Sequence, residues 1–234
     1  MKLNPTPRPT RAFSMTELAI VIVMLLLLGV VMMYYLAVSN RPYGRGGPRI
    51  KCMNNLKQIG LAYRVFANDN DDKFPFNFTN SLAYGNVTQA WLHFQAMSNE
   101  CGSARILICP DDRERLVNQK SDFGMGPLAT VTSLSWKSNY AVSYFASLDA
   151  DETQPNIILS GDRHLLTNRF NMDGRLFLAT SNITSASWTT NQHDGGGNFA
   201  LSDGSVQQVT SSGLTAQMHR QGIATNRLLL PLLP

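Results

Sequence analysis

The sequence predicts an α+β protein that is anchored by one N-terminal membrane helix. Three observations point to this class: an uncharged apolar stretch over residues 18–38, a segment with helical periodicity over residues 53–66, and several short strand-like runs after it. Strands that follow a helix without regular βα alternation are typical of an antiparallel sheet packed on that helix. We therefore expect a transmembrane helix, then a helix packed on a mainly antiparallel sheet with long loops.

The apolar stretch is long enough to span a bilayer. As a helix its 21 residues would reach about 31 Å, close to the hydrocarbon thickness of a membrane. The alternative is a secretory signal peptide, because Ala37, Val38 and Ser39 resemble a small-residue cleavage site. Signal peptides usually have a shorter apolar region of about 7 to 15 residues, so we favour a retained span.

The chain divides into four predicted parts: a basic leader (1–12), a transmembrane helix (13–38), a linker rich in proline and glycine (39–49) and a globular head (50–234). The linker should interrupt a helix, either as a hinge or as a tolerated local insertion. Three positive charges of the net +4 lie in the leader. The rest of the chain is therefore close to neutral, and no basic cluster with interleaved aromatic residues indicates nucleic-acid binding.

In the second predicted helix, apolar residues recur at helical spacing; they are Met53, Leu56, Ile59, Tyr63 and Phe66. This helix should end near Asn68, where an acidic run forms a solvated turn. In the rest of the head we expect strands over 105–109, 140–145, 157–159 and 176–178, helices over 91–97 and 215–220, and a long surface loop over 113–138.

A single carboxylate, that of Glu17, lies at the mouth of the apolar stretch. A charge at this place is costly unless it is neutralised. The side chain either reaches into the lipid headgroups or pairs with a cation. An unpaired buried charge is very unfavourable, whereas a paired one roughly breaks even.

The residues before Glu17 indicate the cation. This part of the sequence has a basic leader, the small residue Ala12, then Phe13, and Glu17 at the fifth position counted from Phe13. It resembles the type IV prepilin cleavage and methylation signal. Members of that family more often carry glycine in place of Ala12. The resemblance implies that a membrane prepilin peptidase cuts after Ala12 and methylates the amine of Phe13. In a filament, this amine of one subunit would lie near Glu17 of another, which favours one axial register.

The head extends the resemblance. Residues 52–62 are similar to the segment after the membrane helix in type II secretion pseudopilins of the H-x9-D-G group, particularly those of Verrucomicrobia and Planctomycetes. Further similar segments lie at residues 108–111, 138–140, 149–153, 160–163 and 224–228. The resemblance implies a pilin-like fold and a pseudopilin subunit of a type II secretion or type IV pilus-like filament. Its partners would be other pseudopilins, prepilin peptidase, the inner-membrane secretion machinery and membrane lipid.

The same resemblance implies a location. The protein would cross the bacterial inner membrane once, with a cytoplasmic leader and a periplasmic head, and would enter a short periplasmic filament. The charges on the two sides of the span do not decide the orientation, because basic residues follow the span as well as precede it.

The H-x9-D-G motif is complete in His193, Asp203 and Gly204. The motif predicts a β-hairpin, because Asp-Gly is a strong turn signal between the strand-like runs 198–201 and 206–209. His193 and Asp203 would form either a hydrogen-bonded clamp across this hairpin, which we favour, or a pair of metal ligands. Nothing else in the sequence completes a tetrahedral metal site.

The sequence predicts no cofactor. If a metal is bound, calcium is the candidate. The resemblance implies it, because major pseudopilins of type II secretion commonly hold calcium in C-terminal loops. Calcium needs several oxygen ligands, and the candidates are Asp162, Asp194 and Asp203.

The three cysteines are Cys52, Cys101 and Cys109. In an exported domain one pair can be oxidised, which leaves an odd thiol. Cys101 with Cys109 is the closest pair in sequence, Cys52 with Cys109 is equally allowed, and three buried free thiols are the remaining alternative. No pair has the C-x-x-C spacing of a redox enzyme.

Catalytic motifs are missing from the sequence. It has no G-x-S-x-G, no H-E-x-x-H and no phosphate-binding G-x-x-x-x-G-K, and its four histidines are scattered. We therefore expect a structural subunit and no enzyme. The alternative function is a membrane-tethered binding module that recognises a polysaccharide or exported cargo without assembling.

Overall fold

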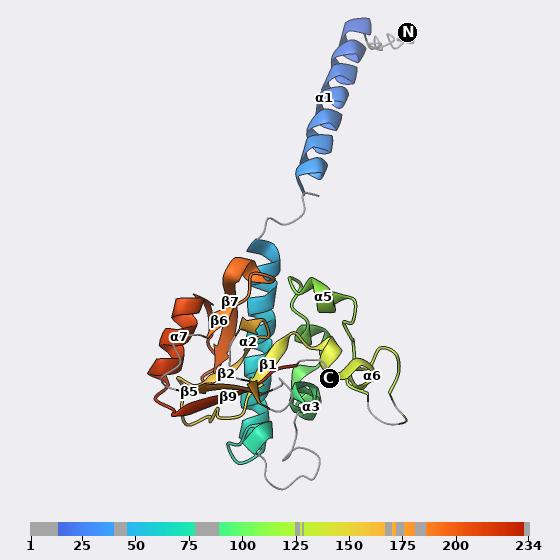
Figure 1. Cartoon of the computed structure of the whole chain (residues 1–234). Helices are drawn as coiled ribbons and strands as arrows, with labels where there is room; N and C mark the ends of the chain where they lie inside the picture. The colour runs from blue at the N-terminus through green and yellow to red at the C-terminus, as the bar shows by residue number, and fades with distance from the viewer. Residues whose placement is uncertain are drawn as a thin grey trace, which may run out of the picture. The chain divides into compact units, whose positions relative to one another are not determined.

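The computed structural model describes residues 14–39, 46–77, 89–124, 127, 129–166, 170–171, 176–180 and 186–231. The chain divides into two compact units, Met1–Gly44 and Arg45–Pro234, and each is described by itself (Figure 1). The first unit contains helix α1 (Met15–Ser39). Within it, Met15–Leu36 is the one helix among the described residues that is long and apolar enough to cross a membrane. The predicted N-terminal apolar helix is confirmed.

The second unit contains all remaining elements. Its helices are α2 (Gly46–Asp69), α3 (Ala90–Ala96), α4 (Ser98–Cys101), α5 (Arg113–Leu116), α6 (Leu134–Lys137) and α7 (Ser211–Arg220), with short 3-10 turns η1 (Pro75–Asn77), η2 (Ala104–Leu107), η4 (Ser138–Ala141) and η5 (His193–Gly195). Its strands are β1 (Tyr144–Ser147), β2 (Ile158–Asp162), β3 (Leu165–Leu166), β4 (Phe170–Asn171), β5 (Leu176–Thr180), β6 (Ser187–Trp188), β7 (Gly196–Leu201), β8 (Val206–Thr210) and β9 (Thr225–Leu229).

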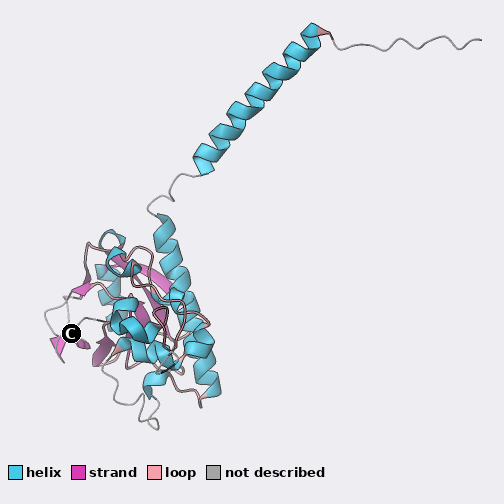
Figure 2. Ribbon diagram, turned by 90° about the vertical axis from the view of Figure 1, so that its right-hand side faces the viewer, coloured by secondary structure: helices cyan, strands magenta, loops and turns pink. Residues whose placement is uncertain are grey.

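Helix α2 is the longest element of the second unit (Figure 2). It begins at Gly46, so the end of the predicted linker forms its first turn. Proline is tolerated there, because the first amide groups of a helix have no partner within it. Residues 40–45 of the linker lie outside the described part of the chain. The fully buried stripe of α2 is Cys52, Leu56, Ile59, Tyr63 and Ala67. The predicted members Met53 and Phe66 are half-buried at its edges.

The main sheet has seven strands in the order β4-β5-β9-β1-β2-β7-β8, and neighbouring strands are antiparallel. Strands β3 and β6 form a separate antiparallel pair. The predicted α+β class with an antiparallel sheet is therefore confirmed. The predicted hairpin is also confirmed, because β7 pairs with β8 from Gly196 opposite Thr210 to Ala200 opposite Val206.

Alternate residues of the central strands enter two different cores, as the period of two in a β-strand requires. Tyr144 and Leu159 pack in the core that contains the buried face of α2. Their neighbours Phe145 and Ile158 pack in the other core, together with Leu214 of α7. The sheet therefore has α2 on one face and α7 on the other. This arrangement places α2 along β7, with which it is in contact.

Three expectations about local structure are wrong in whole or in part. The strand expected over 140–145 begins only at Tyr144, because Ser138–Ala141 is a 3-10 turn. Residues 105–109 do not form a strand, since Ala104–Leu107 is a 3-10 turn. The hydroxyl of Ser103 caps that turn by accepting from the Arg105 N–H at 3.3 Å, and the carbonyl of Leu107 accepts from the Ser143 N–H at 2.8 Å. The expected loop over 113–138 contains helices α5 and α6.

Candidate functional site

The first candidate position, Glu17, lies in a hydrogen-bonded cap at the start of α1. The Ser14 backbone N–H donates to Glu17 Oε2 at 2.9 Å, and the Ser14 hydroxyl donates to the same oxygen at 3.1 Å. The Glu17 N–H in turn donates to Ser14 Oγ at 3.3 Å. This reciprocal pattern is a capping box, which satisfies amide groups that a helix leaves free. The carboxylate is thus held by Ser14, the residue that directly follows Phe13. Ala12 and Phe13 themselves lie outside the described residues.

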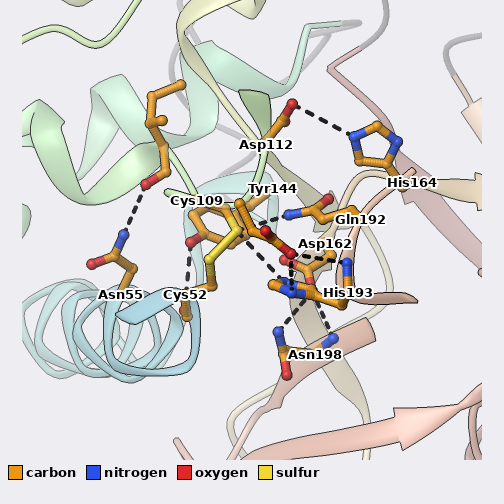
Figure 3. Close-up of a disulfide and its surroundings, with 12 residues drawn as sticks. Cys52, Asn55, Cys109, Asp112, Tyr144, Asp162, His164, Gln192, His193 and Asn198 are labelled. Carbon is orange, nitrogen blue, oxygen red and sulfur yellow. Dashed lines mark hydrogen bonds and ion pairs between the residues drawn. A yellow bond between two sulfur atoms is a disulfide. The ribbon is translucent and has the colours of Figure 1, made fainter. Parts of the chain in front are cut away.

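A disulfide between Cys52 and Cys109 is the centre of a second, buried site in the other unit (Figure 3). It joins α2 to the segment that follows η2, with the two Cα atoms 4.8 Å apart. Both cysteines are fully buried. Cys101 remains a free, half-buried thiol, and burial, helped by the nearby charge of Glu100, raises its pKa to about 12. Of the pairings that the sequence left open, the structure contains Cys52 with Cys109.

His193 lies directly against this disulfide (Figure 3). Its Nε2 is 3.5 Å from Cys109 Sγ and 3.3 Å from Asp162 Oδ2. Its Nδ1 is 2.8 Å from Asp111 Oδ2, which also accepts the His193 backbone N–H at 3.0 Å. The side-chain amide of Gln192 donates to Cys109 Sγ at 2.8 Å. The imidazole therefore bridges two carboxylates and covers the sulfur of Cys109.

The Asp162 carboxylate is buried between strands β2 and β7. It accepts hydrogen bonds from the backbone N–H of Asn198 at 2.7 Å and from the Asn198 side-chain amide at 2.9 Å. All of these contacts, and that of His193, are to Oδ2, whereas Oδ1 is buried without a hydrogen-bond partner among the described residues, so they offset only part of the cost of burying the carboxylate. Asp162 thus links the disulfide region to the main sheet.

The backbone at His193 has an unusual conformation. His193 and Asp194 both have φ of 53°, and Gly195 has φ of 83°. The left-handed region costs a non-glycine residue roughly 1 kcal/mol or more. The contacts of His193 with Asp111 hold this turn in place, and the turn directs the chain into β7.

The other end of the motif has a different role. Asp203 and Gly204 form the turn between β7 and β8, where Asp203 Oδ1 accepts the Ser205 N–H at 2.8 Å and Gly204 has φ of 83°. The carbonyl oxygen of Asp203 accepts from Arg64 Nη1 at 3.1 Å. His193 and Asp203 therefore bond to different partners, and the predicted clamp between them does not form.

The spacing of the motif matches the distance along α2 from Cys52 to Arg64. His193 docks at Cys52 through the disulfide, and Asp203 docks at Arg64, twelve residues further along α2. Twelve helical residues extend about 18 Å, similar to the roughly 20 Å of the six-residue strand β7. The nine intervening residues of the motif therefore lay β7 along α2 with one contact at each end.

The three carboxylates considered for calcium do not come together. Asp162 is buried against Asn198, Asp194 is exposed beside His193, and Asp203 lies at the hairpin turn. Among the described residues, two other groups have the right spacing to hold a metal: Cys52, Cys109 and His193, and Asp112, Glu114 and His164. The sulfurs of the first are bonded to each other, and the guanidinium of Arg163 is bonded to both carboxylates of the second. Neither group fits a metal ion.

A second buried ion pair lies next to Asp111. Arg163 contacts both oxygens of the Asp112 carboxylate, at 2.8 and 3.0 Å, and His164 Nε2 lies 3.6 Å from Asp112 Oδ1. Burial raises the pKa of Asp112, but hydrogen bonds from His164 and Arg163 together outweigh it and hold the pKa well below its ordinary value of 3.8. The carboxylate is therefore charged at neutral pH and contributes to stability there.

Sequence reasoning missed Asp111, Asp112 and Arg163 as partners in this site. A signal was nevertheless present, because three of the segments singled out in the sequence meet here. Residues 52–62 supply Cys52, residues 108–111 supply Cys109 and Asp111, and residues 160–163 supply Asp162 and Arg163.

Comparison of the chain with protein-family models, with curated proteins and with solved structures found no match. The chain is thus characterised by its own geometry: an α+β fold with an antiparallel sheet, an N-terminal helix compatible with one membrane span, and a buried disulfide covered by a histidine.

Replacing both bridged cysteines, as Cys52→Ser with Cys109→Ser, should lower the free energy of unfolding by about 4 kcal/mol, because the bridge closes a loop across 57 residues in the unfolded chain. Urea unfolding of the detergent-solubilised full chain, followed by tryptophan fluorescence, measures the change. Cys101→Ser is the matched control and should change stability much less. Equal losses in the two variants would contradict the assigned pairing.

His193→Asn and Asp203→Ala should act independently. Asparagine tolerates the left-handed backbone, so His193→Asn isolates the lost imidazole contacts, with an expected loss of about 2 kcal/mol. The Asp203→Ala loss should be smaller, since its side chain makes an exposed turn contact. In a double-mutant cycle their coupling should stay below about 0.5 kcal/mol. A coupling well above this value would show that His193 and Asp203 interact directly, as in the predicted clamp.

Asp112 should make stability depend on acid pH. A carboxylate with a lowered pKa stabilises the fold above its unfolded pKa, near 3.8, and this stabilisation is lost as the pH falls further. Below this pH the unfolding free energy of the wild-type protein should fall more steeply than that of Asp112→Asn, by about 1.4 kcal/mol per pH unit. The exposed variant Asp69→Asn should keep the wild-type slope. Identical slopes for wild type and Asp112→Asn would refute the assignment.

Proposed function

We propose that this chain is a pilin-like structural subunit of a type II secretion or type IV pilus-like filament, processed after Ala12 and held by α1. The observation that carries the proposal is the geometry at the start of α1. There a single carboxylate, that of Glu17, is fixed at the mouth of an uncharged helix by Ser14. The next residue toward the N-terminus, Phe13, becomes the chain end if the leader is removed.

The disulfide supports the proposed orientation in the membrane. Structural disulfides form in oxidising compartments and are rare in the cytosol. The Cys52–Cys109 bridge is fully buried and lies in the unit that follows the span. A head in the periplasm and a leader in the cytoplasm satisfy this requirement. The disulfide thus favours one orientation, whereas the charges that flank the span do not.

The capping box gives Glu17 two separable roles. As a helix cap it bonds to Ser14 in its own chain. As a charge it needs a cation when it enters an apolar environment, and the amine of Phe13 of a neighbouring subunit supplies one. A neutral amide in place of the Glu17 carboxylate could still form the cap with Ser14, whereas only the carboxylate can form the ion pair.

The mature N-terminus tests processing. In a bacterial host that contains a prepilin peptidase, mass spectrometry of the purified protein should find a chain that begins with methylated Phe13. A chain that begins at Met1 or at Asn40 would contradict the proposal.

Glu17→Gln separates the two roles of the carboxylate. Glutamine can replace glutamate in a capping box but has no charge, so the variant should insert normally and fail to assemble. Thr16→Ala is the control, because it changes a neighbouring polar side chain in the same turn and leaves the carboxylate in place. Assembly is measured by crosslinking and by sedimentation of filaments. If Glu17→Gln assembles as well as the wild type, the residue is a cap only.

A further inference from the structure

A surface pocket of about 350 Å³ opens between α2 and the segment 105–110. Two exposed cationic side chains, Lys51 and Arg105, lie on its opposite walls. None of the described residues that line it is acidic. Its volume is at the small end of the range for ligand-binding pockets, roughly 300 to 1,000 Å³. Neither the membrane helix nor the motif of His193 uses this pocket.

The two walls of the pocket are fixed to each other. The disulfide joins α2 to Cys109, directly beside the wall residue Pro110. The Asn55 side-chain amide donates to the carbonyl of Ile108 at 2.9 Å. The Gln119 amide donates to the carbonyl of Arg105 at 3.1 Å. The pocket is therefore formed before any ligand arrives, which lowers the entropic cost of binding.

The lining also contains side-chain amides. Asn54 and Gln58 are exposed one turn apart on α2, and Gln119 lies on the opposite side. An amide side chain both donates and accepts hydrogen bonds, as a sugar hydroxyl does. Lysine and arginine instead recognise carboxylates and other anions. The pocket thus combines two charges for an anion with amides for hydroxyl groups.

We propose that this pocket binds an acidic saccharide, with the carboxylate of a uronic acid unit between Lys51 and Arg105 and its hydroxyls on Asn54 and Gln58. An extended acidic peptide is less suitable, because peptides commonly bind by adding a strand to a sheet edge, and here a helix and a turn form the walls. The proposal does not depend on filament assembly. It identifies a ligand class for the head that either an assembled or an unassembled protein can bind.

Isothermal titration of the detergent-solubilised full chain with trigalacturonate tests the proposal. We expect binding of the free acid and none of its uncharged methyl ester at the same millimolar concentrations. Arg105→Gln should weaken binding at least tenfold, because it removes a charge-assisted hydrogen bond. Arg113→Gln removes an exposed arginine outside the pocket lining and should leave the affinity unchanged. The hydrogen bonds of Arg105 described above use its backbone, so the variant should keep the wild-type melting temperature.

A second variant distinguishes a saccharide site from a general anion site. Gln58→Ala retains both cations and should still weaken trigalacturonate binding several-fold. Inorganic sulfate and hexaglutamate, tested as competitors, should not displace the saccharide. Competition by either one, unchanged affinity in Gln58→Ala, or no binding of trigalacturonate would each overturn the proposal.

Discussion

The bond between Cys52 and Cys109 is the constraint on which the second unit depends. It fixes the N-terminal part of α2 to the segment after η2, although the two cysteines are 57 positions apart along the chain. His193 then packs on Cys109 and brings with it Asp111, Asp162 and the start of β7. The helix, the sheet and the turn of residues 104–110 therefore meet at one covalent point. The pocket beside Arg105 takes its shape from the same connection.

Much of the fold can be predicted from local sequence patterns. The apolar helix α1 follows from an uncharged run, α2 from its helical spacing, and the β7–β8 hairpin from Asp203 and Gly204 between two strand-like runs. The strand expected over 105–109 shows where this reasoning ends. Its isoleucine and leucine residues favour a strand locally, but Ser103 caps a turn there, and Asn55 and Ser143 bond to its carbonyl groups. Asn55 and Ser143 are remote in sequence.

The sequence indicates His193 as a candidate residue but does not indicate which side chains it contacts. The spacing of the motif predicts Asp203 as the partner of His193. Its real partners, Asp111 and Asp162, lie 82 and 31 positions before it and reach it only after the sheet and the disulfide have formed. Such contacts depend on the arrangement of several elements, and no local pattern encodes them. At Glu17 the sequence indicated a missing cation, and the structure adds that Ser14 already holds the carboxylate as a helix cap.

The histidine that covers the bridge also affects the order in which the protein matures. Cys52 and Cys109 are made long before His193 and Gln192, the two residues that close over the sulfur. The thiols are thus open to oxidants and isomerases only until the C-terminal hairpin folds. After that, both sulfurs are without solvent exposure, and exchange with other thiols requires the hairpin to open. Folding therefore protects the bond from exchange, and an incorrect pairing has to be repaired before the C-terminal hairpin is in place.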